Sequence, residues 1–240
     1  MTTVQQNVSD IAAGSLGAVR VFERYGIDYC CGGKRPLEEV CGEKGIPTDK
    51  LLAELEAAAA SATDSEVDWT TAPLHQLIRH ILSRHHEFLK SELPRVAERL
   101  DKVMRVYGTQ DAATLAPLPE LFGGLRQELE LHMHKEEMML FPVIERYEAA
   151  VAAGQRLPPA PFGSVANPIL VMEREHSSAG DALQGMHDST KGYEIPPHAC
   201  ITYRSLLNGL RELEEDLHQH IHLENNILFP RAIALESANR

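Results

Sequence analysis

The chain has 240 residues, a formal net charge of −12 and four cysteines, and at this length it can bury a core and form one or two domains without disulfide or metal staples. The negative charge argues against nucleic acid as a partner, because proteins that bind phosphate backbones usually carry a basic patch. No apolar run approaches the roughly 18 residues of a membrane span and the polar start is no signal peptide, so we expect a soluble cytoplasmic protein without a membrane partner.

The first part of the chain predicts a small domain of three helices, over 9–24, 36–43 and 48–60. Capping serine, threonine or aspartate residues begin the first and third helices, a proline suits the first turn of the second, and a glycine ends it. Three short helices lie near the lower size limit for independent folding. We expect a domain over 1–60 and a polar linker over 61–69.

The remainder predicts four long helices with apolar residues at three- and four-residue spacing. The predicted helices cover 73–107, 120–149, 168–187 and 198–237, with loops over 108–119, 154–168 and 191–197. Prolines inside the second and fourth helices, Pro142 and Pro230, predict a bend in each. The fold class is therefore all-α, with an up-down-up-down four-helix bundle over 70–240.

An eleven-residue frame occurs twice, at 132–142 and at 220–230, with His, His, Glu, Leu, Phe and Pro at the same offsets. In each copy the first histidine and the glutamate lie within about 40° of each other on a helix and can face one point. The second histidine, His134 or His222, points about 200° away and is taken as a flanking residue. A single pair is most often a solvated surface pair, but its repetition indicates a duplicated hairpin with both pairs in one interior.

The partner helices should each add a ligand at an equivalent depth. Each copy of the frame is preceded, at nearly the same distance, by another histidine, His86 before the first and His176 before the second. His85 competes with His86, because a helix rotation of about 100° would exchange them. The candidate metal ligands are His86, His132, His176, His220, Glu136 and Glu224.

Four imidazoles and two carboxylates suit iron or manganese, and suit zinc less well because six ligands exceed one tetrahedral site. We expect two iron ions, each held by two histidines, with Glu136 and Glu224 bridging between them. Oxo or hydroxo bridges would complete the centre and leave a position open to a small ligand.

Two further acids are candidates for orienting the imidazoles or for handling protons. Glu128 lies one helical turn before His132, and Glu175 immediately precedes His176. Either acid can equally be a solvated surface residue.

Segment 29–33 reads Tyr-Cys-Cys-Gly-Gly. Its glycines allow positive φ beside Cys30 and Cys31, and a turn there could expose the thiols to redox partners or to a soft metal. The alternative is two small buried residues before a glycine helix stop. Adjacent cysteines make a poor structural disulfide, which fits a reducing compartment, and Cys41 and Cys200 are interpreted as packing cysteines.

Together these motifs produce a family likeness over essentially the whole chain. The sequence resembles the repair-of-iron-centres (RIC) di-iron proteins of the YtfE/ScdA type. Segment 28–33 is similar to the signature of their ScdA-like N-terminal domain. The motifs similar to the ligand motifs of their hemerythrin-like domain are His86, 132–136, 172–176 and 220–230. Either half alone would be less specific.

The resemblance implies a non-haem di-iron centre on the six candidate ligands, and a role in restoring iron–sulfur clusters damaged by oxidative or nitrosative stress. The family is linked both to iron donation and to reduction of nitric oxide to nitrous oxide. The resemblance also implies that Cys30 and Cys31 are functionally important thiols. The sequence departs from the family by adding His134 and His222, and such spare imidazoles can recruit another ion.

Three functions fit these features. The leading hypothesis is a stress-response protein that donates labile iron to damaged iron–sulfur proteins, with the N-terminal thiols receiving iron, docking the client or reducing the centre. The second is an oxidoreductase that reduces nitric oxide to nitrous oxide, with Glu128 or Glu175 supplying protons. The third is a hemerythrin-like carrier or sensor of O2 or NO, against which the cysteine domain counts. Whether the chain forms a homodimer is left open.

Overall fold

The structure is a computed structural model that describes residues 2–60 and 67–239. These residues form helices and no strand, so the predicted all-α fold is confirmed for them. Most of the predicted linker over 61–69 lies outside the described residues. The chain divides into two compact units. Unit 1 takes its residues from 1–78, 145–158 and 218–240, and unit 2 from 79–144 and 159–217.

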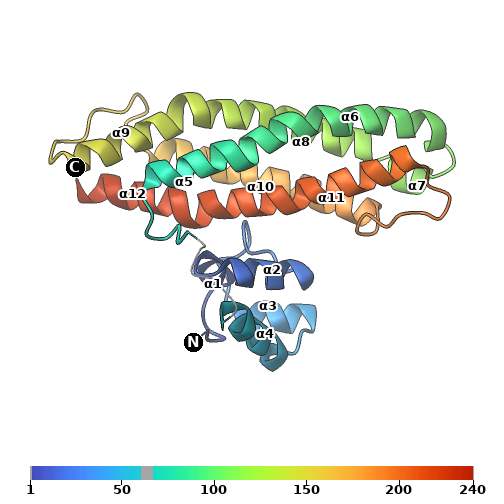
Figure 1. The fold of residues 1–240 in the computed structure, drawn as a ribbon, viewed down its shortest axis with the longest axis horizontal. Helices are drawn as coiled ribbons and strands as arrows, with labels where there is room; N and C mark the ends of the chain where they lie inside the picture. The colour runs from blue at the N-terminus through green and yellow to red at the C-terminus, as the bar shows by residue number, and fades with distance from the viewer. Residues whose placement is uncertain (1, 61–66, 240) are drawn as a thin grey trace. The chain divides into compact units, whose positions relative to one another are not determined.

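The N-terminal part of unit 1 contains four short helices. They are α1 (Val8–Ala13), α2 (Leu16–Arg24), α3 (Leu37–Lys44) and α4 (Thr48–Ala60), as Figure 1 shows. The prediction of one helix over 9–24 is wrong, because the backbone at Ser15 is extended and its side chain accepts a hydrogen bond from the Ala18 amide, which starts α2. The predicted glycine stop of α3 is confirmed, since Gly45 has a left-handed backbone with a φ of 65°.

Unit 1 also includes all or part of several later elements of the chain. These are α5 (Leu74–His80), α9 (Phe141–Ala152), the end of α11 (Ile201–His222), η3 (Leu223–Leu228) and α12 (Phe229–Ala238). The Glu148 carboxylate accepts hydrogen bonds from the amides of Leu74 and His75, at 2.6 and 3.0 Å, and so caps α5. Arg231 donates to the carbonyls of Trp69 and Ala72, at 2.6 Å each. These bonds fix the start of the first long helix.

Unit 2 is a four-helix bundle. Its helices are α6 (Glu87–Tyr107), α8 (Leu118–Lys135), α10 (Ala166–Ser189) and most of α11 (Ile201–His222). Successive helices run in opposite directions along the bundle, as predicted (Figure 1). Each helix turns an apolar stripe inward, and its buried members include Leu93, Leu129, Leu183 and Leu210.

Two of the predicted loops are shorter in the structure. Segment 108–119 contains the short helix α7 (Ala112–Leu115), and α8 starts before its end, at Leu118. Helix α10 starts inside the predicted crossover, at Ala166. Proline is tolerated in the first turn of a helix, because the amides there have no helical acceptor to lose. Pro168 therefore does not mark the start of α10.

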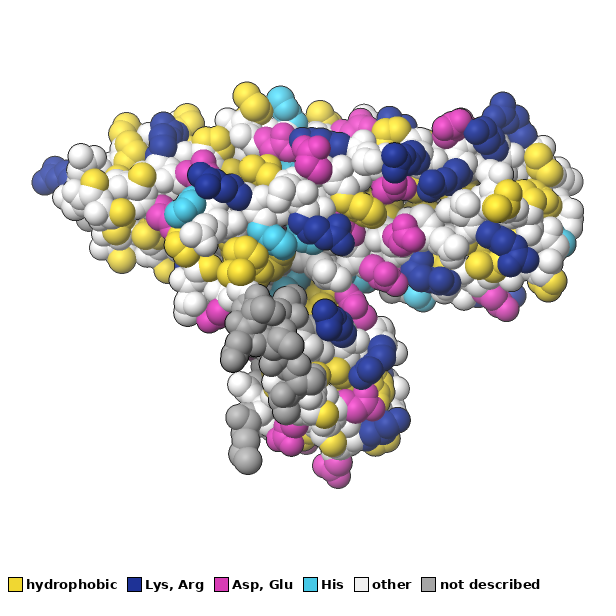
Figure 2. All heavy atoms as spheres, in the orientation of Figure 1, with side chains coloured by type: hydrophobic (Ala, Val, Ile, Leu, Met, Phe, Trp, Pro, Cys, Tyr) yellow, Lys and Arg dark blue, Asp and Glu magenta, His cyan; other side chains and the backbone are white. Residues whose placement is uncertain are grey.

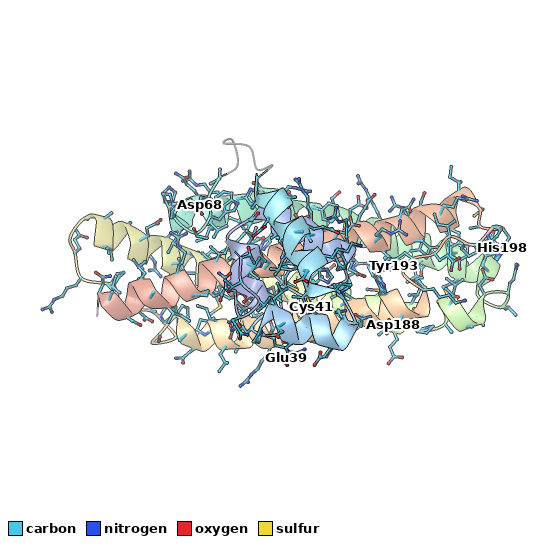
Figure 3. All side chains as sticks on the ribbon, turned by 90° about the horizontal axis from the view of Figure 1, so that it is seen from below. Glu39, Cys41, Asp68, Asp188, Tyr193 and His198 are labelled. Atoms are coloured by element: carbon cyan, nitrogen blue, oxygen red, sulfur yellow. The ribbon has the colours of Figure 1, made fainter. Side chains whose placement is uncertain are left out.

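A buried tyrosine holds the loop between α10 and α11. Tyr193, labelled in Figure 3, has a positive φ of 58° and is 1% exposed. Its hydroxyl donates to the Glu214 carboxylate, and its amide donates to the Thr190 hydroxyl at 3.0 Å. Arg211 donates to its carbonyl at 2.9 Å. The loop is thus closed by the C-cap residue of α10 and by two side chains of α11, which the sequence pattern did not indicate.

Three segments of the long helices are π-helical, where α-helix was predicted. They are η1 (Ile81–His86), η2 (Glu136–Leu140) and η3 (Leu223–Leu228). Pro142 and Pro230, for which bends were predicted, are the second residues of α9 and α12, the helices that directly follow η2 and η3. Proline cannot donate a helical amide bond, and π-helical turns are a common cause of helix distortion and occur often at functional sites.

Acidic and basic side chains are interspersed on the face seen in Figure 2. Several on unit 2 form pairs along one helix, such as Lys102 with Glu98 and Arg126 with Glu130. Exposed pairs of this kind contribute little stability. None of the helices in 2–60 and 67–239 combines the length and apolar character needed to cross a membrane.

Replacing Leu129 with alanine should lower the free energy of unfolding by about 2–5 kcal/mol, because this side chain is 4% exposed in the bundle core. Leu131 on the same helix is 60% exposed, and its replacement should change stability by less than about 0.5 kcal/mol. Urea denaturation of both metal-free variants measures the difference. Equal losses would show that the inward face of α8 is assigned wrongly.

Candidate metal centre

Glu136 is the centre of a buried cluster in unit 2. Its carboxylate is fully buried, and Oε2 lies 3.5 Å from Nε2 of His86 and 3.3 Å from Nε2 of His132. His176 Nε2 lies 3.0 Å from His132 Nε2. The three imidazoles are each at most 2% exposed. Unit 2 therefore brings together four of the six predicted ligands.

The local sequence explains how these side chains meet. His132 is in the last turn of α8 and Glu136 is the first residue of η2, so they lie four residues apart and face the same way. His176 comes from α10, which packs along α8. His86 is the last residue of η1, and its ring stacks on Phe141 with centroids 5.8 Å apart. Three separate helices thus position four side chains.

Two of the imidazoles also contact a carboxylate on their outer side. His86 Nδ1 lies 2.8 Å from Glu137 Oε1, and His132 Nδ1 lies 2.8 Å from Glu175 Oε2. A carboxylate at Nδ1 favours the tautomer with its proton on Nδ1, which leaves the Nε2 lone pair pointing at the cluster. This is the arrangement that a histidine needs to bind a metal through Nε2.

A lysine supports each of these outer carboxylates. Lys90 Nζ lies 2.8 Å from Glu137 Oε1, and Lys135 pairs with Glu175. Partial burial acts to raise the pKa of Glu137, but its bonds to Lys90 and His86 outweigh this and hold that pKa below its usual value. The pKa of Glu175 is lowered in the same way, against the effect of burial, by Lys135 and His132. Both carboxylates are therefore ionised at neutral pH.

His85 and His86 have different contacts in the structure. His85 is also buried, but its Nδ1 lies 3.1 Å from Asp216 Oδ1, whereas His86 contacts Glu136 and Glu137. Arg84 lies 3.5 Å from the same Asp216 oxygen. His85 thus has the contacts of a buried histidine paired with an acid.

The second copy of the frame has the same geometry in unit 1. His220 Nε2 lies 3.0 Å from Glu224 Oε1, and the two residues are 1% and 0% exposed. Glu224 lies in η3 as Glu136 lies in η2. Both histidine–glutamate pairs are therefore buried pairs on one helix face rather than solvated surface pairs.

The two flanking histidines differ. His134 is exposed, whereas His222 is 3% exposed and packs edge-on against the Tyr29 ring, with centroids 5.3 Å apart. Asn226 Nδ2 lies 2.9 Å from His222 Nδ1. Burial lowers the pKa of His222 to about 4, so its ring is neutral at neutral pH. His222 is a buried contact of the N-terminal helices, which its position in the repeat did not indicate.

The four cysteines occupy different environments. Cys30 is buried and Cys31 is half-buried, so neither of the two interpretations of segment 29–33 holds for both residues. Cys41 of α3, labelled in Figure 3, is 0% exposed, as expected of a packing cysteine. Cys200 is exposed, just before α11, so its interpretation as a packing cysteine is wrong.

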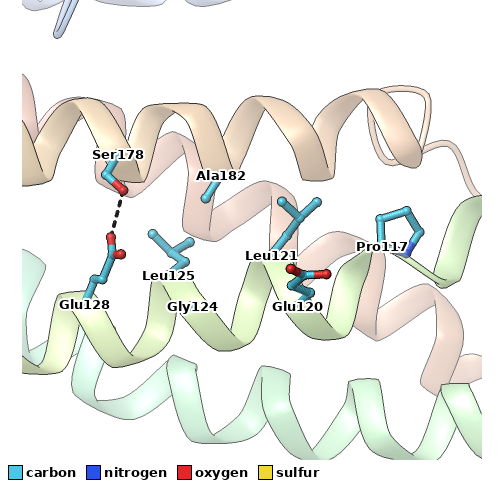
Figure 4. Close-up of a pocket in the computed structure, with 8 residues that line it drawn as sticks. All are labelled: Pro117, Glu120, Leu121, Gly124, Leu125, Glu128, Ser178 and Ala182. Carbon is cyan, nitrogen blue, oxygen red and sulfur yellow. Dashed lines mark hydrogen bonds between the residues drawn. The ribbon is translucent and has the colours of Figure 1, made fainter.

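Glu128 and Glu175 have different surroundings. Glu175 contacts His132, as described above, whereas Glu128 is exposed and accepts a hydrogen bond of 2.9 Å from Ser178. The Glu128 carboxylate lines a shallow surface pocket of about 420 Å³ between α8 and α10 (Figure 4), whose other lining residues include Glu120, Leu121 and Ala182. Glu175 therefore has the contacts expected of an orienting acid, and Glu128 those of a surface acid.

The donor set fits a metal ion. His132, Glu136 and His176 each offer one ligand atom, and these atoms lie within 4.8 Å of one another. Buried nitrogen and oxygen donors of this kind suit first-row transition metals such as iron. A cation would also offset the charge of a buried carboxylate, which is costly to keep away from water. The chemistry of this histidine and glutamate group therefore fits a metal site.

Sequence reasoning missed several residues around the ligands. Glu137 was passed over because its counterpart in the second copy is Asn225, so the repeat does not include it. Asp216 and Asn226 gave no local signal, since their partners His85 and Tyr29 are distant in sequence. The available signal was a charged residue next to a predicted ligand, and it applied to Lys135 and Glu137, which flank Glu136.

Comparison with known proteins places both parts of the chain. Residues 4–59 match the model of ScdA_N, a domain of unknown function (DUF542), and residues 77–232 match that of the hemerythrin HHE cation binding domain. The iron-sulfur cluster repair protein YtfE of Citrobacter koseri is 37% identical over 236 residues, covering 98% of this chain and 100% of the relative. The proteins of that name from Escherichia coli O81 and Cronobacter sakazakii are each 38% identical over 231 residues, covering 96% of this chain and 98% and 97% of the relatives.

Replacing Glu175 with glutamine should weaken metal binding about 10- to 100-fold, because His132 loses the charged acceptor that orients it. Glu128→Gln is the matched control on the neighbouring helix and should leave affinity unchanged. Competition with a chromophoric chelator for ferrous iron measures both. A larger loss for Glu128→Gln than for Glu175→Gln would reverse the two assignments.

Proposed function

Because the chain belongs to the family of iron–sulfur cluster repair proteins that join an ScdA_N domain to a hemerythrin HHE cation-binding domain, we propose that it repairs iron–sulfur clusters damaged by oxidative or nitrosative stress. The observation that carries this proposal is the buried carboxylate of Glu136 among His86, His132 and His176. Its targets are the damaged iron–sulfur proteins, and its means is donation of iron held at this site.

We propose further that all six predicted ligands bind a pair of iron ions. The equivalence of the two histidine–glutamate pairs supports this, since each is buried and each glutamate lies in a π-helical segment. Glu136 and Glu224 would bridge the two ions and offset part of their charge. His86, His132, His176 and His220 would supply the four imidazoles.

The chemistry of these donor atoms suits a site that must release its iron. Imidazole and carboxylate donors hold ferrous iron less tenaciously than a cage of cysteine thiolates would. The chain's own residues then set how firmly the ligands are presented. Glu137 and Glu175 hold two of the imidazoles in the binding tautomer, and Lys90 and Lys135 keep those carboxylates ionised. Weakening any of these contacts would favour release.

Replacing Glu136 and Glu224 together with glutamine should abolish iron binding, because both buried negative charges are lost while side-chain size is kept. The wild type reconstituted without oxygen should hold two irons per chain by elemental analysis. Glu130→Gln with Glu212→Gln, both exposed on α8 and α11, is the matched control and should keep both ions. Full retention of iron by the first double variant would contradict the proposed ligand set. A single iron in the wild type would contradict the proposed number of ions.

Iron donation is tested by labelling the metal. Protein loaded with a Mössbauer-active iron isotope is mixed without oxygen with a nitric-oxide-damaged iron–sulfur protein, a reductant and cysteine. The label should appear in the spectrum of the restored cluster, and the Glu136→Gln, Glu224→Gln variant with the same amount of chelated label should not transfer it. Recovery of the cluster without the label would contradict donation. Nitrous oxide release without label transfer would instead favour the oxidoreductase alternative.

A further inference from the structure

Asp28 organises the two adjacent cysteines of unit 1. Its Oδ1 accepts hydrogen bonds from the amides of Cys30 and Cys31, at 2.9 and 3.0 Å. Its Oδ2 accepts from the amide of Gly32 at 2.8 Å. One carboxylate therefore accepts hydrogen bonds from three consecutive amides, and both thiols lie on the turn that these bonds form.

The following glycines make this turn possible. A Cβ at Gly32 would lie 2.8 Å from Asp28 Oδ2, and one at Gly33 would lie 2.6 Å from the Tyr29 carbonyl oxygen. Both distances are below those of ordinary contacts, so any larger residue would push the carboxylate or the backbone away. The paired glycines are needed for close approach rather than for positive φ.

The carbonyls of the turn are held from η3. Asn226 Nδ2 donates to the Tyr29 carbonyl at 3.0 Å, and Asn225 Nδ2 donates to the Cys30 carbonyl at 3.4 Å. Cys30 is therefore fixed on both sides, by Asp28 at its amide and by Asn225 at its carbonyl.

The two thiols differ in access and in hydrogen bonding. Cys30 is 6% exposed, and its Sγ lies 3.3 Å from Asp28 Oδ1, to which the S–H can donate. Cys31 is half-buried, and its Sγ lies 3.8 Å from that of Cys30. The bond to Cys31, burial and the nearby charges of Cys31 and Asp28 all raise the pKa of Cys30 well above its usual value. Since the thiolate is the nucleophile, burial and this raised pKa make Cys30 a poor nucleophile.

We propose that Cys31 is the attacking thiol and Cys30 the resolving thiol of a dithiol that reduces small disulfides, with Asp28 as the positioning residue that sets this order. The Cys31 thiolate attacks one sulfur of the disulfide, forms a mixed disulfide and releases one thiolate. Cys30 Sγ then attacks Cys31 Sγ, its proton passes to the second leaving thiolate, and a Cys30–Cys31 disulfide forms. The substrate gains two electrons and the cysteine pair loses two. This activity needs no bound iron, so it goes beyond the repair proposal and can fail independently of it.

The test uses the full chain carrying Cys200→Ser, with dithionitrobenzoate as the disulfide probe and the fully buried Cys41 as an internal reference. The expected result is two thionitrobenzoates released per chain and no mixed disulfide by mass spectrometry. Cys30→Ser should release one and keep the other as an adduct on Cys31. Cys31→Ser should react more slowly by about tenfold or more, because only the buried thiol remains. A stable adduct on the unmutated pair, or equal rates for the two single variants, would overturn the proposal.

The role of Asp28 is tested separately, by alkylating Cys30 with iodoacetamide in the Cys31→Ser chain. Asp28→Asn keeps an oxygen for the backbone amides but removes the charge, so alkylation of Cys30 should become several-fold faster. Asp49→Asn, an exposed acid of α4, is the matched control and should leave the rate unchanged. An unchanged rate in Asp28→Asn would remove Asp28 from the proposal, while the order of the thiols would still be decided by the disulfide probe.

Discussion

The burial of a carboxylate is the constraint on which the rest of this molecule depends. Glu136 is fully buried inside a helical bundle, where an ionised group is costly unless it is compensated. Three imidazole side chains from separate helices converge on this region, and two of them contact outer acids that are supported by lysines. The packing of unit 2 thus serves to keep a polar cluster in one geometry. This requirement explains why unit 2 buries His86, His132 and His176 within an otherwise apolar core.

The π-helical segments lie at three of the proposed ligands. His86 ends η1, Glu136 begins η2 and Glu224 lies in η3. A π-helical turn widens the helix and changes the direction of the side chains that follow it. Each is therefore a local departure from regular helix at a proposed ligand position, which the surrounding packing must stabilise. The prolines that follow η2 and η3 are compatible with this, since they cannot continue the helical hydrogen bonds.

In unit 1, the second copy of the frame contacts the turn that carries Cys30 and Cys31. Asn225 and Asn226 directly follow Glu224 and bind the carbonyls of Cys30 and Tyr29, and His222 packs on the Tyr29 ring. The first copy has charged or apolar residues at these positions, with Glu137 and Met138 in place of the two asparagines. The same two positions therefore have different contacts in the two copies: Glu137 contacts His86, whereas Asn225 and Asn226 bind the N-terminal turn.

The sequence alone determined the helical fold class, the order of the long helices and the candidate ligands, because helical periodicity and a repeated frame are local properties of the chain. It failed at Ser15, where a side-chain cap splits a helix, and at Cys200, whose exposure depends on packing. Tertiary structure gave His85 and His86 different surroundings, because each imidazole pairs with an acid from another helix, Asp216 or Glu137. It also decided the unequal burial of Cys30 and Cys31, and the hydrogen bond between the Cys30 carbonyl and Asn225 of η3, nearly two hundred residues away. Contacts between segments distant in sequence leave no periodic trace, so no pattern along the chain could have predicted them.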